Sequence, residues 1–146
     1  MSFAQISLKG RALRLLSGRE HSRAELERKL QRFEEEPGAL ARALDELQAK
    51  GFIDEQRVLE SVIHCRAAKL GAARIKQELQ GKGLNREAIS AALISLQATE
   101  YERALEVWRK KFGTAAVDAA AAAKQMRFLA ARGFAADSIR RVVSGV

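Results

Sequence analysis

Residues 73–84 read ARIKQELQGKGL, and a weaker form of the same phrase, AKQMRFLAARGF, occupies residues 123–134. Leu79 and Leu129 are 50 positions apart, as are Gly83 and Gly133. Leu30 stands 49 positions before Leu79, so the apolar frame occurs three times. Repetition at this interval is typical of stacked helical units, which offer an extended binding surface more often than one enzymatic pocket.

The composition favours helices around a buried core. The chain has 146 residues, of which 47% are hydrophobic and 30% charged, and it contains one proline. Ala, Leu, Glu, Lys, Arg and Gln dominate, and apolar residues recur at i, i+4 and i+7 with no strand-like alternation. We therefore predict an all-α fold of nine helices in three tandem three-helix repeats, at residues 1–53, 54–97 and 98–146, forming one continuous array.

Local signals place several helix ends. Ser22 followed by Glu25 is a capping-box pattern. The acidic run at residues 34–36 precedes Pro37, which predicts that this proline lies in the first turn of the third helix. An alanine-rich eighth helix is expected to include Val117.

No pattern in the chain indicates catalysis or a bound metal. Glycine-rich phosphate loops are missing, and the neighbours His64 and Cys65 would point about 100° apart on a helix. Cys65 is expected to be a small inward-facing thiol, and as a lone cysteine it favours a reducing cytoplasm. We predict a cytoplasmic protein that is not an enzyme, has no cofactor or metal, and has no apolar run of the roughly 20 residues that span a membrane.

The positive charge is concentrated in the last two repeats. The net charge is +8, yet residues 1–60 hold 11 basic and 11 acidic side chains. Residues 61–97 and 98–146 therefore carry the whole excess, which favours nucleic acid or an acidic protein as partner. The candidate partner- or DNA-binding residues are Arg66, Lys69, Arg74, Lys76, Lys82, Arg86, Arg109, Lys110, Lys111, Lys124, Arg127 and Arg132.

Part of this charge has a purely helical explanation. Glu78 is placed to pair with Arg74 and Lys82 at i±4, and cations suit helix C-termini. Tyr101 and Trp108 lie on a core-like stripe, so few aromatic rings are left for base stacking. Any contact with nucleic acid would then be mainly to phosphate and sensitive to salt.

A winged helix-turn-helix is the specific alternative for the first repeat. The segments at residues 22–30 and 40–54 resemble its helical half, after which two wing strands would follow Gly51. Here Asp54 instead starts another long helix, and the neutral charge of residues 1–60 argues against a DNA-reading helix there.

The chain resembles the RecX family, the regulators of the bacterial RecA recombinase. The resemblance extends from about Arg11 to Val143 and includes the phrase at residues 22–30 and the junction at residues 47–54. Its most specific stretch is Arg66-x-x-Lys69-x-Gly71-x-x-Arg74-Ile75-x-x-Glu78-Leu79-x-x-Lys82-Gly83-Leu84. Family members usually carry a longer Lys-Gly-aromatic-Gly-Pro turn where this chain has the shortened turn at residues 69–72.

The resemblance implies an elongated, curved protein that lies in the groove of the RecA–single-stranded-DNA filament and lowers recombinase, ATPase and coprotease activity. In that interpretation repeats two and three face acidic RecA surface or DNA phosphate, while repeat one mainly supplies shape. The alternatives are a sequence-tolerant DNA-binding protein without a recombinase partner and a scaffold for another acidic protein.

Overall fold

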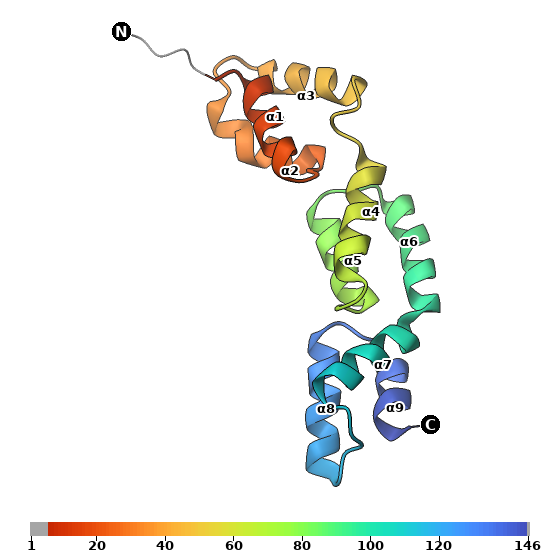
Figure 1. Cartoon of the computed structure of the whole chain (residues 1–146). Helices are drawn as coiled ribbons and strands as arrows, with labels where there is room; N and C mark the ends of the chain where they lie inside the picture. The colour runs from red at the N-terminus through yellow and green to blue at the C-terminus, as the bar shows by residue number, and fades with distance from the viewer. Residues whose placement is uncertain (1–5, 146) are drawn as a thin grey trace. The chain divides into compact units, whose positions relative to one another are not determined.

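The chain folds into helices joined by short loops (Figure 1). The computed structural model describes residues 6–145, and this part contains no strand, which confirms the all-α fold and excludes wing strands there. The helices are α1 Leu8–Gly18, α2 Arg23–Leu30, the 3₁₀ turn η1 Gln31–Phe33, α3 Ala39–Ala49, α4 Glu55–Arg66, α5 Ala72–Gly81, α6 Arg86–Ala98, α7 Glu100–Lys111, α8 Ala119–Ala131 and α9 Ala136–Ser144.

Short polar side chains set several helix starts. Before α2, the Ser22 hydroxyl accepts from the Glu25 amide at 3.1 Å, and the Glu25 carboxylate accepts from the Ser22 amide at 3.0 Å. The predicted capping box is therefore confirmed. Asp54 and Asp118 accept in the same way from the amides three residues ahead, at 3.1 and 2.8 Å.

Three local predictions were wrong. Helix α3 begins at Ala39 after Gly38, whose φ of 85° is left-handed, so Pro37 lies in the preceding turn. The acidic run still contributes, because a Glu34 carboxylate oxygen accepts from the Leu40 amide at 2.8 Å. Val117 lies outside α8 with 92% of its surface exposed, since Asp118 takes the cap position. Cys65 is exposed rather than inward-facing.

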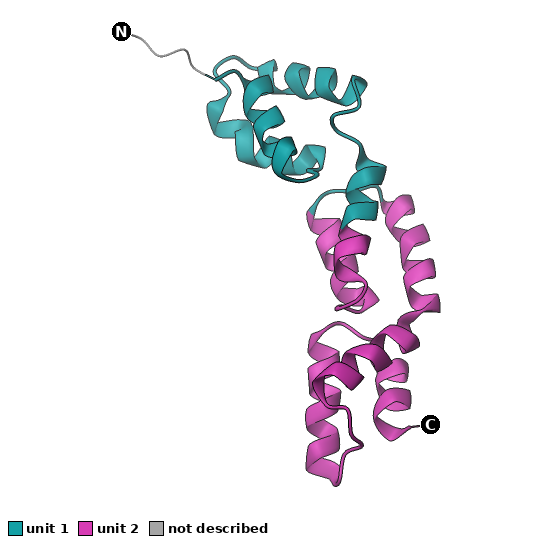
Figure 2. Cartoon of the chain, viewed as in Figure 1, with its two compact units in different colours: residues 1–61, 82–85 teal, residues 62–81, 86–146 magenta. Residues whose placement is uncertain are grey.

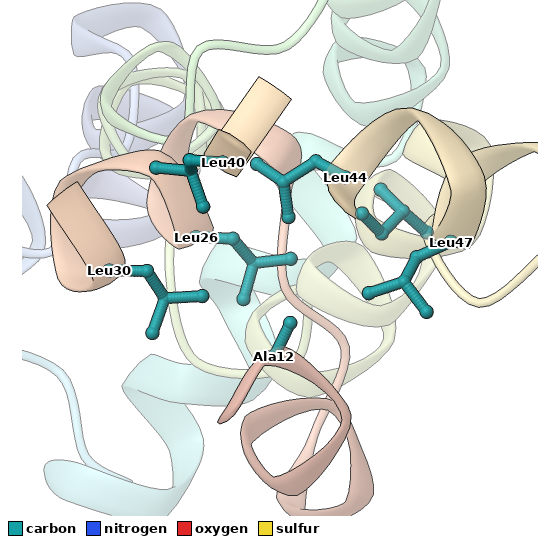
Figure 3. Close-up of a cluster of buried hydrophobic side chains, with 7 residues drawn as sticks. Ala12, Leu26, Leu30, Leu40, Leu44 and Leu47 are labelled. Carbon is teal, nitrogen blue, oxygen red and sulfur yellow. The ribbon is translucent and has the colours of Figure 1, made fainter. Parts of the chain in front are cut away.

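The chain divides into two compact units (Figure 2). Unit 1 contains the described residues up to Ser61 together with Lys82–Asn85, and unit 2 contains Val62–Gly81 and the residues from Arg86 onward. In unit 1 apolar side chains of α1, α2 and α3 converge on one core (Figure 3). Its buried members are Ala12, Leu26, Leu30, Leu40, Leu44, Leu47 and Ile53.

The apolar frame of the repeat is buried in each three-helix group. Leu30, Leu79 and Leu129 are 2%, 0% and 0% exposed. The position four residues earlier holds Leu26 in the first group and Ile75 in the second, both fully buried.

In the third group a polar residue takes that second position. Gln125 is buried and accepts from the Trp108 indole N–H at 2.9 Å. Its amide nitrogen donates to the Thr114 carbonyl at 3.2 Å. Because both ends of the amide are hydrogen-bonded, burying it carries little penalty and it orients the indole ring.

Candidate partner-binding surface

A glutamate caps a helix of the preceding group at two equivalent places. In unit 1, Glu55, the first residue of α4, accepts from the backbone N–H of Arg23, the first residue of α2, at 3.4 Å. In unit 2, Glu100, the first residue of α7, accepts from the N–H of Ala72, the first residue of α5, at 2.7 Å. A carboxylate at a helix N-terminus accepts a hydrogen bond from an otherwise unpaired amide and interacts favourably with the positive end of the helix dipole.

A loop carbonyl makes the second contact at each place. The Ser22 hydroxyl donates to the Lys82 carbonyl at 2.6 Å, and the Gly71 amide donates to the Arg132 carbonyl at 2.8 Å. Each carbonyl directly precedes a left-handed glycine, Gly83 or Gly133.

The two places therefore form one recurring contact, which we call the repeat junction. The first junction, in unit 1, comprises the start of α2, the Lys82–Asn85 loop and the start of α4. The second junction, in unit 2, comprises the start of α5, the Arg132–Gly133 loop and the start of α7. A Cβ on Gly71 would overlap the backbone of Gly133, so the second junction admits only glycine at this approach. The segment that repeats in the sequence therefore also supplies the loop that contacts a helix start at each junction.

Glu25 is the centre of a charged cluster at the first junction. Its carboxylate accepts from the Arg19 guanidinium at 2.7 Å, from the Lys82 ammonium at 3.1 Å and from the Ser22 amide. Burial by itself raises the pKa of Glu25, but these donors outweigh it and lower the pKa to about 2. Glu25 is therefore ionised throughout the physiological pH range and holds Lys82 in place.

Arg103 ties three backbone carbonyls together near the second junction. Its guanidinium donates to the carbonyls of Ala67, Leu70 and Leu96 at 3.0, 2.7 and 2.7 Å. Burial lowers the pKa of Arg103, and the nearby Glu100 carboxylate opposes that shift. These bonds join the loop before α5, the end of α6 and helix α7.

Four of the twelve predicted binding cations form hydrogen bonds or ion pairs within the chain. Lys82 binds Glu25, and Arg74 donates to the Ala131 carbonyl at 2.7 Å. Arg66 pairs with Glu78 at 3.0 Å, so the predicted pairing of Glu78 with Arg74 and Lys82 was wrong, because both cations reach across a junction instead. Arg109 makes an exposed 3.6 Å pair with Glu106.

Two further cations lie over an aromatic ring. Lys111 and Arg132 approach the Phe128 ring at 5.4 and 4.7 Å from its centroid. The Phe112 ring meets the Phe128 ring edge-on at 5.4 Å. Tyr101 and Trp108 pack against the third-group core, as the stripe predicts. These rings are engaged within unit 2.

The other six predicted cations are exposed and form no salt bridge among the described residues. They are Lys69, Lys76, Arg86, Lys110, Lys124 and Arg127. All six belong to unit 2. A binding role for any of the twelve residues stays a prediction.

Sequence reasoning missed the residues that build the junctions. Glu55 and Glu100 were counted only as charges, and Arg103 was not singled out. A signal was present, because both α4 and α7 begin with glutamate one residue after a polar Asp54 or Thr99. Over residues 6–145 no group of three or more His, Cys, Asp or Glu side chains could hold a metal ion. None of the helices in that range is both long and apolar enough to cross a membrane.

The chain is similar along most of its length to proteins of one family. Three family models match, described as the first, second and third three-helix domains of RecX, at residues 9–47, 54–93 and 98–143. Regulatory protein RecX of Leptothrix cholodnii is 51% identical over 95% of this chain and 88% of its own length. Regulatory protein RecX of Herminiimonas arsenicoxydans is 46% identical over 96% and 93%.

Solved structures share the fold. The crystal structure of RecX from Lactobacillus salivarius superposes with a TM-score of 0.77 at 22% identity, covering 94% of this chain and 93% of that one. A second crystal structure, of a regulatory protein RecX, gives a TM-score of 0.71 at 20% identity, covering 95% and 72%.

Proposed function

Because the chain belongs to the RecX family, we propose that it regulates RecA by binding the RecA–single-stranded-DNA filament and lowering its recombinase, ATPase and coprotease activity. The match of all three RecX domains, in order and over residues 9–143, is the observation that carries this proposal. The proposal treats this chain as a regulator, which is what the names of its relatives state, and it assigns no catalytic activity to the chain.

The repeat junctions support a binding role. Each junction holds a helix start against the next group by a carboxylate cap and a loop carbonyl. Side chains beside each junction are thereby pre-organised within their own unit, and a filament offers the same surface on successive protomers. Weak contacts then add through high effective concentration.

The exposed cations of unit 2 are the proposed contact residues. Lys69 and Lys76 are exposed and form no salt bridge among the described residues, whereas Arg74 and Lys82 act within the junctions. Acidic protein surface or DNA phosphate on the filament would complement them. Substituting Lys69 and Lys76 therefore tests binding without disturbing a junction.

The test is RecA-dependent ATP hydrolysis on single-stranded DNA with increasing amounts of this protein. We expect suppression by the wild type, and a K69Q/K76Q variant that needs roughly 5–10-fold more protein for half-suppression. The matched control is R42Q/K50Q, which removes the same charge from exposed positions of unit 1. Unchanged suppression by a folded K69Q/K76Q variant would refute the assignment of these residues.

The same assay separates filament regulation from competition for DNA. Excess single-stranded DNA should leave suppression in place if the protein acts on the filament. Suppression that disappears when DNA is added would favour a sequence-tolerant DNA-binding protein without a recombinase partner. No suppression at any ratio would refute the proposed function.

A further inference from the structure

Unit 1 contains a cationic pocket, although the basic and acidic side chains of residues 1–60 balance. The pocket is open, has a volume of about 580 Å³, and lies among α1, α2 and η1. No carboxylate of the described residues lines it. We call it the α1–α2 pocket; its five cations are Arg11, Arg14, Arg28, Lys29 and Arg32, and its apolar wall includes Phe33.

Cations that do not line the pocket form salt bridges within the described part of unit 1. These cations are Lys9, Arg19, Arg23, Lys50, Arg57 and Lys82. Arg11, Arg14, Lys29 and Arg32 take part in none of these salt bridges. Glu35 and Glu36 line a second pocket with Ile6 and Leu8, and Phe33 lines both pockets. The zero net charge of residues 1–60 thus conceals a pocket whose charged lining residues are all cations and a second pocket lined by two glutamates.

An aromatic ring and a histidine position the cations. The Arg11 and Arg32 guanidinium carbons lie 3.7 and 4.7 Å from the centroid of the Phe33 ring. A guanidinium stacked on a ring keeps its N–H edge available and loses little freedom on binding an oxyanion. The Lys29 ammonium lies 3.0 Å from Nε2 of the buried His21, whose Nδ1 is 3.1 Å from the Arg19 carbonyl oxygen.

We propose that the α1–α2 pocket binds the phosphodiester backbone of a nucleic acid without reading its sequence. The polar side chains that line it are all hydrogen-bond donors, which match phosphate oxygens. Base edges and peptide groups also present hydrogen-bond donors, and none of the polar side chains that line the pocket can accept a hydrogen bond from them. Phe33 is covered by guanidinium groups, so the ring is not free to stack a base. This inference rests on unit 1 alone and does not depend on the proposed action on RecA.

The experiment is fluorescence anisotropy of a labelled oligothymidylate of about 20 nucleotides with the full chain and no recombinase. R14Q/R28Q removes two pocket charges, and R42Q/K50Q removes two charges of unit 1 outside the pocket. With about 0.7 counterions released per phosphate contact on a single strand, R14Q/R28Q should flatten the slope of log K against log salt by about 1.4. At about 0.1 M salt this corresponds to a loss of affinity of roughly 10–30-fold, against less than about threefold for the control.

A second variant tests whether the Phe33 ring contributes to binding or whether the positive charge of the pocket is sufficient by itself. Phe33→Leu keeps all five cations and removes the ring beneath Arg11 and Arg32, so affinity should fall by about threefold to fivefold with an unchanged salt slope. Circular dichroism confirms that each variant is folded. Equal affinity of R14Q/R28Q and R42Q/K50Q would overturn the proposal. Displacement of the oligonucleotide by polyglutamate of the same charge, at the same concentration as by unlabelled DNA, would overturn its phosphate specificity.

Discussion

Glu25→Gln tests whether the charged cluster holds the first junction. The carboxylate is buried, with 8% of its side chain exposed, and its pKa falls from 4.5 to about 2. Each unit of pKa is worth about 1.4 kcal/mol, so ionised Glu25 stabilises the folded state by about 3 kcal/mol at pH 7. The neutral amide that replaces the carboxylate no longer attracts Arg19 and Lys82, and we expect the variant to lose about that much stability.

The pH dependence of this loss identifies its electrostatic origin. Because the folded pKa of Glu25 is depressed, its stabilisation is complete above about pH 4.5 and is lost as the pH falls toward about 2. The cost of Glu25→Gln should therefore shrink by about 2 kcal/mol between pH 7 and pH 3. Urea unfolding followed by circular dichroism at both pH values measures it.

A neighbouring glutamate supplies the control. Glu27 lies on the same helix, is 52% exposed, and makes an i,i+4 pair with Arg23. Glu27→Gln should cost less than about 1 kcal/mol, because exposed pairs contribute little. Equal stability of the two variants at pH 7, or a cost of Glu25→Gln that is the same at pH 7 and pH 3, would refute the reasoning.

A double-mutant cycle assigns the partner. Lys82→Met removes the ammonium but keeps the backbone carbonyl that accepts from Ser22. Combined with Glu25→Gln, it should reveal a coupling of about 1–3 kcal/mol. Strictly additive effects would mean that Arg19 and the capping amide, rather than Lys82, stabilise the carboxylate.

Three further predictions concern other parts of the structure. Gly71→Ala should destabilise the chain by about 3 kcal/mol in urea unfolding, because its methyl group meets the Gly133 backbone, whereas Gly81→Ala, with open space around it, should not destabilise it. Arg103→Lys should cost about 2 kcal/mol in the same assay, since one ammonium cannot reach all three carbonyls that the guanidinium serves; a neutral result would contradict the clamp. Burial and the adjacent cations Arg19 and Lys29 lower the pKa of His21, although the Arg19 carbonyl and Glu25 oppose this. The free energy of unfolding should therefore show no loss from His21 above about pH 6.5 and should fall by up to about 1.4 kcal/mol per pH unit below that pH. His21→Asn should remove this slope.

Sequence periodicity was sufficient for the helices and their apolar faces. Leu30, Leu79 and Leu129 were recognised as equivalent, and all three are buried. Helix periodicity depends on residues a few positions apart, so one sequence reveals it. The capping box at Ser22 and Glu25 is equally local and was found in the same way.

Helix periodicity could not predict the contacts between segments that are distant in the sequence. Arg74 and Lys82 were expected to pair with Glu78, but they bind a carbonyl 57 positions away and a carboxylate 57 positions away. Spacing along a helix says which side chains share a face, and not what packs against that face. Net charge has the same limit, since it hides the separation of acids from the cations of the α1–α2 pocket.

The amino-acid sequence by itself determined an all-helical chain of three related groups and its RecX resemblance, because both depend on local patterns that recur at about fifty residues. Only the tertiary structure decided which charged side chains join the groups and which stay exposed. Glu55 and Glu100 become helix caps, and Lys82 becomes the partner of Glu25, because folding brings loop and helix ends together across 28 to 57 positions of chain.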